Sequence, residues 1–178
     1  RTQHPANGIV VAVADGHGSP EYLRSQMGAE LACAVSADKG LQFLSRVAPQ
    51  TRQRVRVVQA QLLCQQIHQS WLLAVRDHHA LHPFPLEQLA TLPPLCVEQI
   101  RARPETAYGS TLLVAIAWST GLVVLQLGDG DILHFREGKS QRLFDRLDRS
   151  DSLTDSLCDE AAVDKFQIVV DAFDLGAP

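Results

Sequence analysis

Leu112-Leu-Val-Ala-Ile-Ala-Trp118 is the stretch that decides the fold, together with the turn Ser119-Thr120-Gly121 and the apolar run that ends at Leu127. The turn predicts that the two runs pair as an antiparallel hairpin. Residues 112–118 do not alternate apolar with polar side chains, as a strand with one solvated face does. An antiparallel strand that is buried on both faces needs another layer on each side. We therefore expect an α+β fold, an α-β-β-α sandwich of two antiparallel sheets flanked by helices.

The other expected elements supply the layers of this sandwich. Further strands are predicted at residues 9–14, 132–136, 141–144 and 165–173, and the first of them is expected to be buried on both faces. A helix is predicted from about residue 21 to 38, between Pro20 and Gly40, with an apolar stripe of Leu23, Met27, Leu31 and Val35. A second is predicted from about 51 to 79, with a stripe of Ala60, Cys64, Ile67, Trp71 and Val75. Proline-rich residues 81–104 are expected to form a surface connection, and the two long helices to flank the two sheets.

The composition predicts one globular domain over residues 1–178. Hydrophobic residues make up 46% of the chain and the net charge is −4, which disfavours a disordered protein. The 16 Lys and Arg against 20 Asp and Glu leave no basic excess to bind the phosphates of a nucleic acid. The longest uninterrupted apolar run is residues 112–118, far short of the roughly 20 residues of a membrane helix. We expect neither a nucleic-acid nor a membrane partner.

The four cysteines, Cys33, Cys64, Cys96 and Cys158, indicate the compartment. They lie far apart and contain no Cys-x-x-Cys pair, which fits neither a zinc ribbon nor a small disulfide framework. The sequence also shows no charged segment followed by an apolar one, as a signal peptide has. Buried, reduced thiols and a cytoplasmic location are therefore predicted.

The first candidate for chemistry is the turn Asp15-Gly16-His17-Gly18, directly after the predicted strand 9–14. A carboxylate at a rigid strand end is well held for metal coordination or acid–base work. Gly16 lets the backbone approach a ligand closely, so its carbonyl oxygen is a candidate ligand as well. His17 is the nearby group whose ordinary pKa lies near neutrality. A plain strand-ending turn with an exposed histidine is the alternative that these residues leave open.

The second candidate is Gly128-Asp129-Gly130-Asp131, again after an apolar strand. Paired carboxylates bind hard cations through oxygen. Asp-Gly is also a common turn dipeptide, so a hairpin turn is the alternative. Both acidic turns follow apolar strands and are flanked by glycine, and Gly109-Ser110-Thr111 opens the strand before the second one.

These segments resemble a known family. Residues 13–18, followed by Arg24-Ser25 and Gly28-Ala29, look like the first motif region of metal-dependent protein phosphatases of the 2C type. Residues 109–113 and 126–131 resemble the Gly-Ser-Thr strand and the Gly-Asp turn of that family, and residues 154–158 resemble a segment of a bacterial subgroup. The matches are colinear from residue 9 to about 170. The family fold is an α-β-β-α sandwich, as the packing argument predicts.

The resemblance implies hydrolysis of phosphoserine and phosphothreonine with two or three Mn²⁺ or Mg²⁺ ions. It implies that Asp15 and His17 are the catalytic residues, Asp15 as the carboxylate that bridges two metals and His17 as the general acid for the leaving alkoxide. It also implies that Gly16 contributes a carbonyl ligand and that Asp129 belongs to a further metal site. The expected partners are a phosphorylated protein substrate and a cognate Ser/Thr kinase.

The chain also departs from the family pattern. The family has an acidic ligand before the first buried strand, an Asp-Gly motif on a late strand and a final Asp-Asn motif, and residues 1–178 supply none of them. We therefore expect a single domain that lacks its first and last motifs. A catalytically inactive regulatory module that binds phosphoproteins is the alternative function.

Two further groups of residues are weaker candidates. His78 and His82 are spaced to share one face of a helix, but no third zinc ligand is evident, and a solvated helix end is the favoured interpretation. The regularly spaced acids from Asp145 to Asp159 lack the EF-hand pattern, so a flexible acidic loop is favoured over a cation site.

Overall fold

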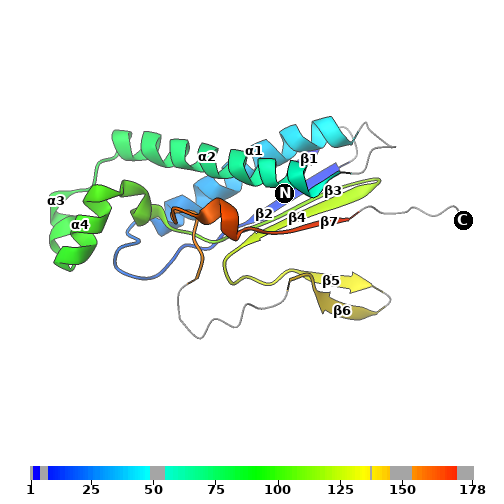
Figure 1. The fold of residues 1–178 in the computed structure, drawn as a ribbon. Coiled ribbons are helices and arrows are strands. Elements are labelled where there is room, and N and C mark those ends of the chain that lie inside the picture. Colours follow the sequence, from blue (N-terminus) through cyan, green and yellow to red (C-terminus); the bar gives the residue numbers. More distant parts are fainter. Residues whose placement is uncertain (1, 5–7, 49–54, 137, 145–153, 172–178) are drawn as a thin grey trace, which may run out of the picture.

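A five-stranded antiparallel sheet forms the centre of the computed structural model, which describes residues 2–4, 8–48, 55–136, 138–144 and 154–171. The strand order is β1-β2-β3-β4-β7 (Figure 1). The strands are β1 Thr2–His4, β2 Gly8–Val13, β3 Leu112–Trp118, β4 Gly121–Leu127 and β7 Gln167–Asp171. A separate two-stranded sheet pairs β5 (Leu133–Arg136) with β6 (Lys139–Arg142).

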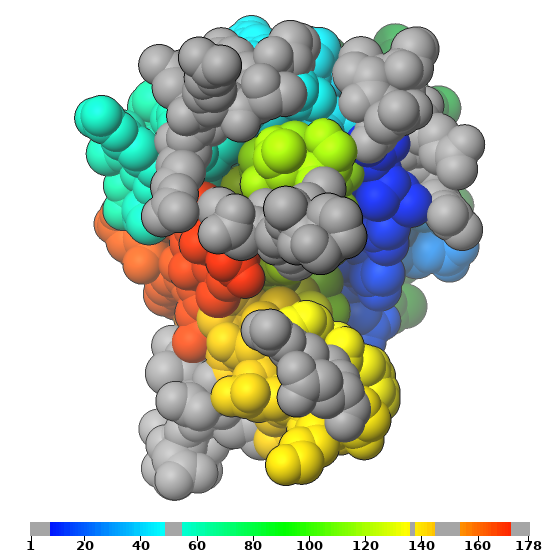
Figure 2. All heavy atoms as spheres, turned by 90° about the vertical axis from the view of Figure 1, so that its right-hand side faces the viewer, coloured from blue at the N-terminus to red at the C-terminus, as the bar shows by residue number. Residues whose placement is uncertain are grey.

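Two long helices, α1 (Ser25–Val47) and α2 (Val57–Leu81), cover one face of the large sheet, and the β5–β6 hairpin lies on the side away from them (Figures 1 and 2). The predicted α+β class is confirmed, with a helical layer, a large sheet and a small second sheet. The expectation that the long helices flank opposite faces is wrong. They pack on each other instead, and the indole Nε1 of Trp71 on α2 donates a hydrogen bond of 3.0 Å to the Gly28 carbonyl of α1.

The register of the sheet shows which side chains face the helices. Val10, Ile116 and Val123 stand side by side on β2, β3 and β4, and each is at most 1% exposed. Val11 and Val13 point to the opposite face and are 36% and 56% exposed. The prediction that residues 9–14 are buried on both faces is therefore wrong for the described part of the chain, because β2 follows the one-sided burial typical of antiparallel strands.

Helix α1 approaches the sheet through small residues. Its fully buried positions include Gly28, Ala32, Ser36 and Gly40, whereas the predicted stripe of Leu23, Met27, Leu31 and Val35 is only partly buried beside them. A Cβ added at Gly40 would come within 2.7 Å of Val10 Cγ1. Gly40 therefore lies inside the helix, where helix and sheet are closest. The prediction that the helix ends before Gly40 is wrong, because α1 continues to Val47.

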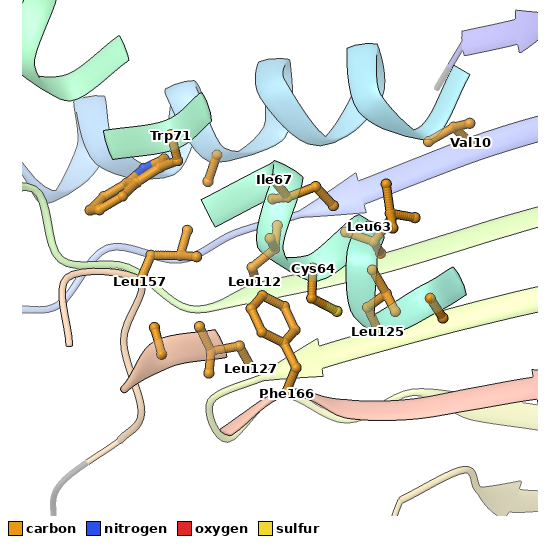
Figure 3. Packing of buried hydrophobic residues seen from close by; sticks show 14 of the residues in the cluster. Val10, Leu63, Cys64, Ile67, Trp71, Leu112, Leu125, Leu127, Leu157 and Phe166 are labelled. Atoms are coloured by element: carbon orange, nitrogen blue, oxygen red, sulfur yellow. The ribbon is translucent and has the colours of Figure 1, made fainter. Parts of the chain in front are cut away.

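Helix α2 carries the stripe that its periodicity predicts, with Ala60, Cys64, Ile67, Trp71 and Val75 all buried. Figure 3 shows Cys64 and Ile67 among Leu112, Leu125 and Phe166 in the main core. Burial raises the pKa of the Cys64 thiol to about 12.

The connection after α2 is more ordered than its prolines suggest. It contains α3 (Leu86–Ala90), α4 (Pro94–Ala102) and the 3₁₀ turn η1 (Pro104–Tyr108), and a second such turn, η2 (Ala162–Lys165), precedes β7. Helix α4 begins at a proline, whose fixed φ suits a first helical position. None of the described helices is both long enough and apolar enough to cross a membrane.

Candidate functional site

Three strand ends meet at one edge of the large sheet. Gly16 follows β2 and forms an isolated bridge with Ser110, just before β3. Leu112 at the start of β3 pairs with Leu127 at the end of β4, so Gly128 and Asp129 leave the sheet at the same edge. The two acidic turns that the sequence singles out are thus brought together by the antiparallel order β2-β3-β4.

Thr111 fixes the main chain of Asp15. The amide of Thr111 donates to the Asp15 carbonyl at 2.9 Å, and the amide of Asp15 donates to Thr111 Oγ1 at 3.2 Å. Asp15 is itself exposed. The strand end is therefore rigid, and its carboxylate faces solvent.

Gly16 directs its carbonyl away from β3. The hydrogen bonds from His17 N to Gly109 O (3.2 Å) and from Thr111 N to Asp15 O flank the Gly16–Ser110 pair, which makes it a pair whose own amides do not bond each other. An open groove of about 550 Å³ borders Asp15 and Gly16 opposite Ser25 and Gln26 of α1. A Cβ at Gly16 would lie 2.6 Å from the carbonyl carbon of Ser25, so the chain passes α1 here only as glycine.

Gly128 begins the second acidic turn. Its φ is +100°, and an added Cβ would lie 2.6 Å from Thr111 Cγ2. The carboxylate of Asp129 is exposed and acts on His17 from this turn. Asp131, by contrast, lies 3.0 Å from the Arg142 guanidinium on β6.

His17 is half-buried between the two turns. Its ring lies 4.7 Å from that of Tyr22, centre to centre, and its Nε2 is buried with no hydrogen-bond partner among the residues described. Burial lowers the pKa of His17, while the carboxylates of Asp159, Asp129 and Asp15 act in the opposite direction. A buried nitrogen without a partner is costly, and a ligand oxygen would satisfy it.

A sequence model of the family described as Protein phosphatase 2C matches residues 1–173. The chain belongs to this family. No curated protein and no solved structure matches it. Phosphatase activity on phosphoproteins with divalent metal ions is typical of the family, and the predicted resemblance is confirmed at that level.

The donor set of this phosphatase 2C domain suits a hard cation in kind. Asp15, Asp129 and the Gly16 carbonyl offer oxygen, which Mg²⁺ and Mn²⁺ prefer over nitrogen or sulfur. No three His, Cys, Asp or Glu side chains come together as a metal site within the described ranges. The structure brings the two aspartates and the carbonyl to one end of the sheet. Their roles as metal ligands, and that of His17 in catalysis, stay predictions.

Residues 154–159 pack beside this site, although the spacing of their acidic residues predicts a flexible loop. Leu157 N donates to Ser110 O at 2.9 Å, and Asp155, only 6% exposed, lies 2.9 Å from the Lys165 ammonium. Asp159 accepts from the same ammonium at 2.9 Å and from the amide of Ser156 at 3.0 Å. The prediction of a flexible acidic loop is wrong for Asp155 and Asp159, because Lys165 compensates their charge. Asp145, Asp148 and Asp151 lie outside the described residues. The sequence signal that indicated an ordered segment was the resemblance of residues 154–158 to a segment of the phosphatase family.

The predicted solvated helix end at the end of α2 is correct for His82, which is exposed, and wrong for His78. His78 is half-buried, and its Nδ1 lies 2.9 Å from the hydroxyl of Tyr108 in η1. Sequence reasoning missed this contact, since Tyr108 lies thirty positions further along the chain.

Proposed function

We propose that this domain hydrolyses phosphoserine and phosphothreonine in proteins, with Mn²⁺ or Mg²⁺ as cofactor and two or three ions at the centre. The observation that supports this most directly is the link through Thr111, which holds the Asp15 main chain and packs against Gly128 before Asp129. A rigid pair of acidic turns at one sheet edge is suited to hold cations in a fixed position.

The metal ligands we propose are the Asp15 carboxylate and the Gly16 carbonyl, with Asp129 at a further ion. When bound, the ions supply an activated water and neutralise charge on the phosphoryl group. The exposed carboxylate of Asp15 costs little to align, because both main-chain groups of the residue are already bonded. The Gly16 carbonyl points away from its neighbouring strand and so is not used by the sheet.

His17 is proposed as the general acid. An alkoxide of serine or threonine is a poor leaving group unless it receives a proton, and a histidine next to the metal ligands is placed to give it. The contact with Tyr22 orients the imidazole. Burial lowers the pKa of His17, and the carboxylates of Asp159, Asp129 and Asp15 offset part of this effect by favouring the charged form. The unpartnered Nε2 is the atom we assign to the substrate oxygen.

The partners in this proposal are a phosphorylated protein and the Ser/Thr kinase that modifies it. A cytoplasmic location, where thiols stay reduced, is part of the same proposal, because all four cysteines are unpaired.

The test is phosphate release from a phosphothreonine peptide at millimolar Mn²⁺, with wild type beside Asp15→Asn. We expect release that a chelator abolishes and that Asp15→Asn lowers by at least about a hundredfold. Asp38→Asn, at an exposed carboxylate of α1, is the matched control and should keep full activity. Equal activity of Asp15→Asn and wild type would contradict the proposal.

The alternative function, phosphoprotein binding without hydrolysis, is favoured by one observation. Asp155 and Asp159, two carboxylates beside the site, are engaged by Lys165, and no three His, Cys, Asp or Glu side chains come together as a metal site within the described ranges. Saturable binding of the phosphopeptide with no phosphate release at any Mn²⁺ concentration would support this second function over the first.

A further inference from the structure

Arg24, the residue before α1, ties together three segments that are distant in sequence. Its guanidinium donates to the carbonyl of His82, to the Tyr108 hydroxyl at 2.8 Å and to the Pro83 carbonyl at 3.1 Å. It also lies 4.4 Å from the centre of the Phe84 ring. Its own amide donates to Ala107 O at 2.7 Å. The start of α1, the turn η1 and the chain after α2 therefore meet at one side chain.

The hydrogen bonds around Tyr108 have a defined direction. Arginine only donates, so the Tyr108 oxygen accepts from Arg24. With Arg24 donating to its oxygen, the Tyr108 hydroxyl can donate its hydrogen to His78 Nδ1, 2.9 Å away. In that arrangement Nδ1 carries no proton, and the neutral His78 ring has its hydrogen on Nε2. Because Tyr108 is 0% exposed, no solvent replaces this partner.

A second proton on His78 is unfavourable with respect to the described groups that contact it or act on its charge. Nδ1 would become a donor, and the buried Tyr108 hydrogen would lose its acceptor. The titratable groups that act on His78 are His82, Arg24 and His79, all of them cations when charged, and Tyr108 contacts it directly. Burial and these cations lower the pKa of His78, and burial and Arg24 lower that of His79, whose ring lies 4.5 Å from Phe84.

We propose that Arg24 is a positioning residue for residues 15–24 and that Arg24, Tyr108 and His78 form a proton-sensitive clamp, which loosens when His78 takes up a proton. The connection to the site is short. Tyr22, whose ring contacts His17, is joined through its carbonyl to the amide of Ser25, the residue after Arg24. The amide of His17 itself bonds to Gly109, next to Tyr108. The catalytic consequence rests on the proposed function; the clamp itself does not.

The first test needs only the wild-type protein. Long-range proton–nitrogen NMR of the His78 ring at neutral pH should show a protonated Nε2 and a bare Nδ1. The opposite tautomer would overturn the proposal, since a protonated Nδ1 cannot accept the hydroxyl hydrogen of Tyr108.

The second test compares amide hydrogen exchange of residues 15–24 at neutral and mildly acidic pH, corrected for the intrinsic pH dependence of exchange. When His78 is protonated in wild type, the protection factors of residues 15–24 should fall about tenfold further than those of the core strands. His78→Asn keeps an acceptor near the Nδ1 position and does not titrate, so it should remove most of this difference. His134→Asn, at an exposed histidine of β5, is the control and should behave as wild type. Equal acid loosening in His78→Asn and wild type, or none in wild type, would overturn the clamp.

Activity gives a separate outcome. If phosphate release occurs, kcat of wild type should decline in acid more steeply than kcat of His78→Asn. If the domain only binds phosphopeptides, the exchange difference is still expected, so failure of the proposed function and failure of the clamp are distinguished.

Discussion

Thr111 lies directly against Gly128: a Cβ on Gly128 would approach Thr111 Cγ2 to 2.6 Å and Thr111 Cβ to 2.9 Å. The same threonine bonds both main-chain groups of Asp15. One side chain therefore sets the distance between the two acidic turns, which predicts how substitutions there act.

Gly128→Ala should lower the free energy of unfolding by about 3 kcal/mol, from a positive φ and a contact with Thr111. Gly138→Ala is the matched control, since Gly138 has φ +75° and open space around its added Cβ, and it should cost about 1 kcal/mol. Urea denaturation measures both. Thr111→Ser removes Cγ2 and should recover part of the loss in the Gly128→Ala background. Equal costs at the two glycines would show that the Thr111 contact does not matter.

His17→Gln should reduce phosphate release from a phosphothreonine peptide by about a hundredfold or more, because the leaving alkoxide then lacks its proton donor. Hydrolysis of p-nitrophenyl phosphate should decline far less, because nitrophenolate leaves without a proton. Steady-state kcat on both substrates checks this. The same loss on both would assign His17 to metal or phosphate binding rather than to acid catalysis.

Lys165→Met should cost about 2 kcal/mol, because it removes the ammonium that lies 2.9 Å from the buried Asp155 carboxylate. Lys39→Met, which breaks the exposed pair with Asp38, should change stability by less than about 0.5 kcal/mol. Hydrogen bonds to Asp159 and Asp155 raise the pKa of Lys165, so its contribution is present below the ordinary lysine pKa and is lost at strongly alkaline pH. Adding Asp155→Asn to Lys165→Met should restore stability; a further loss would contradict the charge argument.

Tyr22 should ionise about two pH units later than an ordinary tyrosine. Burial, with smaller effects of Cys158, Glu21 and Asp159, raises its pKa to about 12. Between pH 10 and 12 the folded protein keeps a proton that the unfolded chain loses, so Tyr22 favours unfolding as the pH rises through this window. The phenolate absorbance of wild type minus that of Tyr22→Phe isolates the residue. A difference signal complete near pH 10 would contradict this environment.

Elements with a local pattern were predictable from the sequence. Strand β4 ends at Leu127, where its apolar run ends, and the buried stripe of α2 is the predicted one, because both follow from local patterns of large apolar side chains. The buried stripe of α1 was not predictable in this way. From Gly28 to Gly40 it consists of glycine, alanine and serine, and their burial depends on how closely the sheet approaches, which a pattern search for large side chains does not detect.

The candidate site, too, was only partly predictable from the sequence. The order β2-β3-β4, which brings the two acidic turns to one end of the sheet, came from the structure. Asp15, Gly16 and Asp129 were predictable as candidate ligands from the resemblance of the two glycine-flanked turns to the phosphatase family. The partners of His78 and Asp155 were not, because Tyr108 and Lys165 carry no local signal that names them as partners. Charge compensation and hydrogen-bond direction are properties of contacts between distant segments, and they appear only once the chain is folded.

The two glycines at which α1 touches its neighbours also limit how the domain deforms. Gly28 packs on the Tyr108 carbonyl and Gly40 on Val10, about 18 Å apart along the helix axis. A helix held at two separated points cannot rotate about its axis or slide along it without breaking both contacts. We therefore expect a displacement of residues 15–24 to be absorbed by backbone torsions before Ser25 and not to be transmitted along α1.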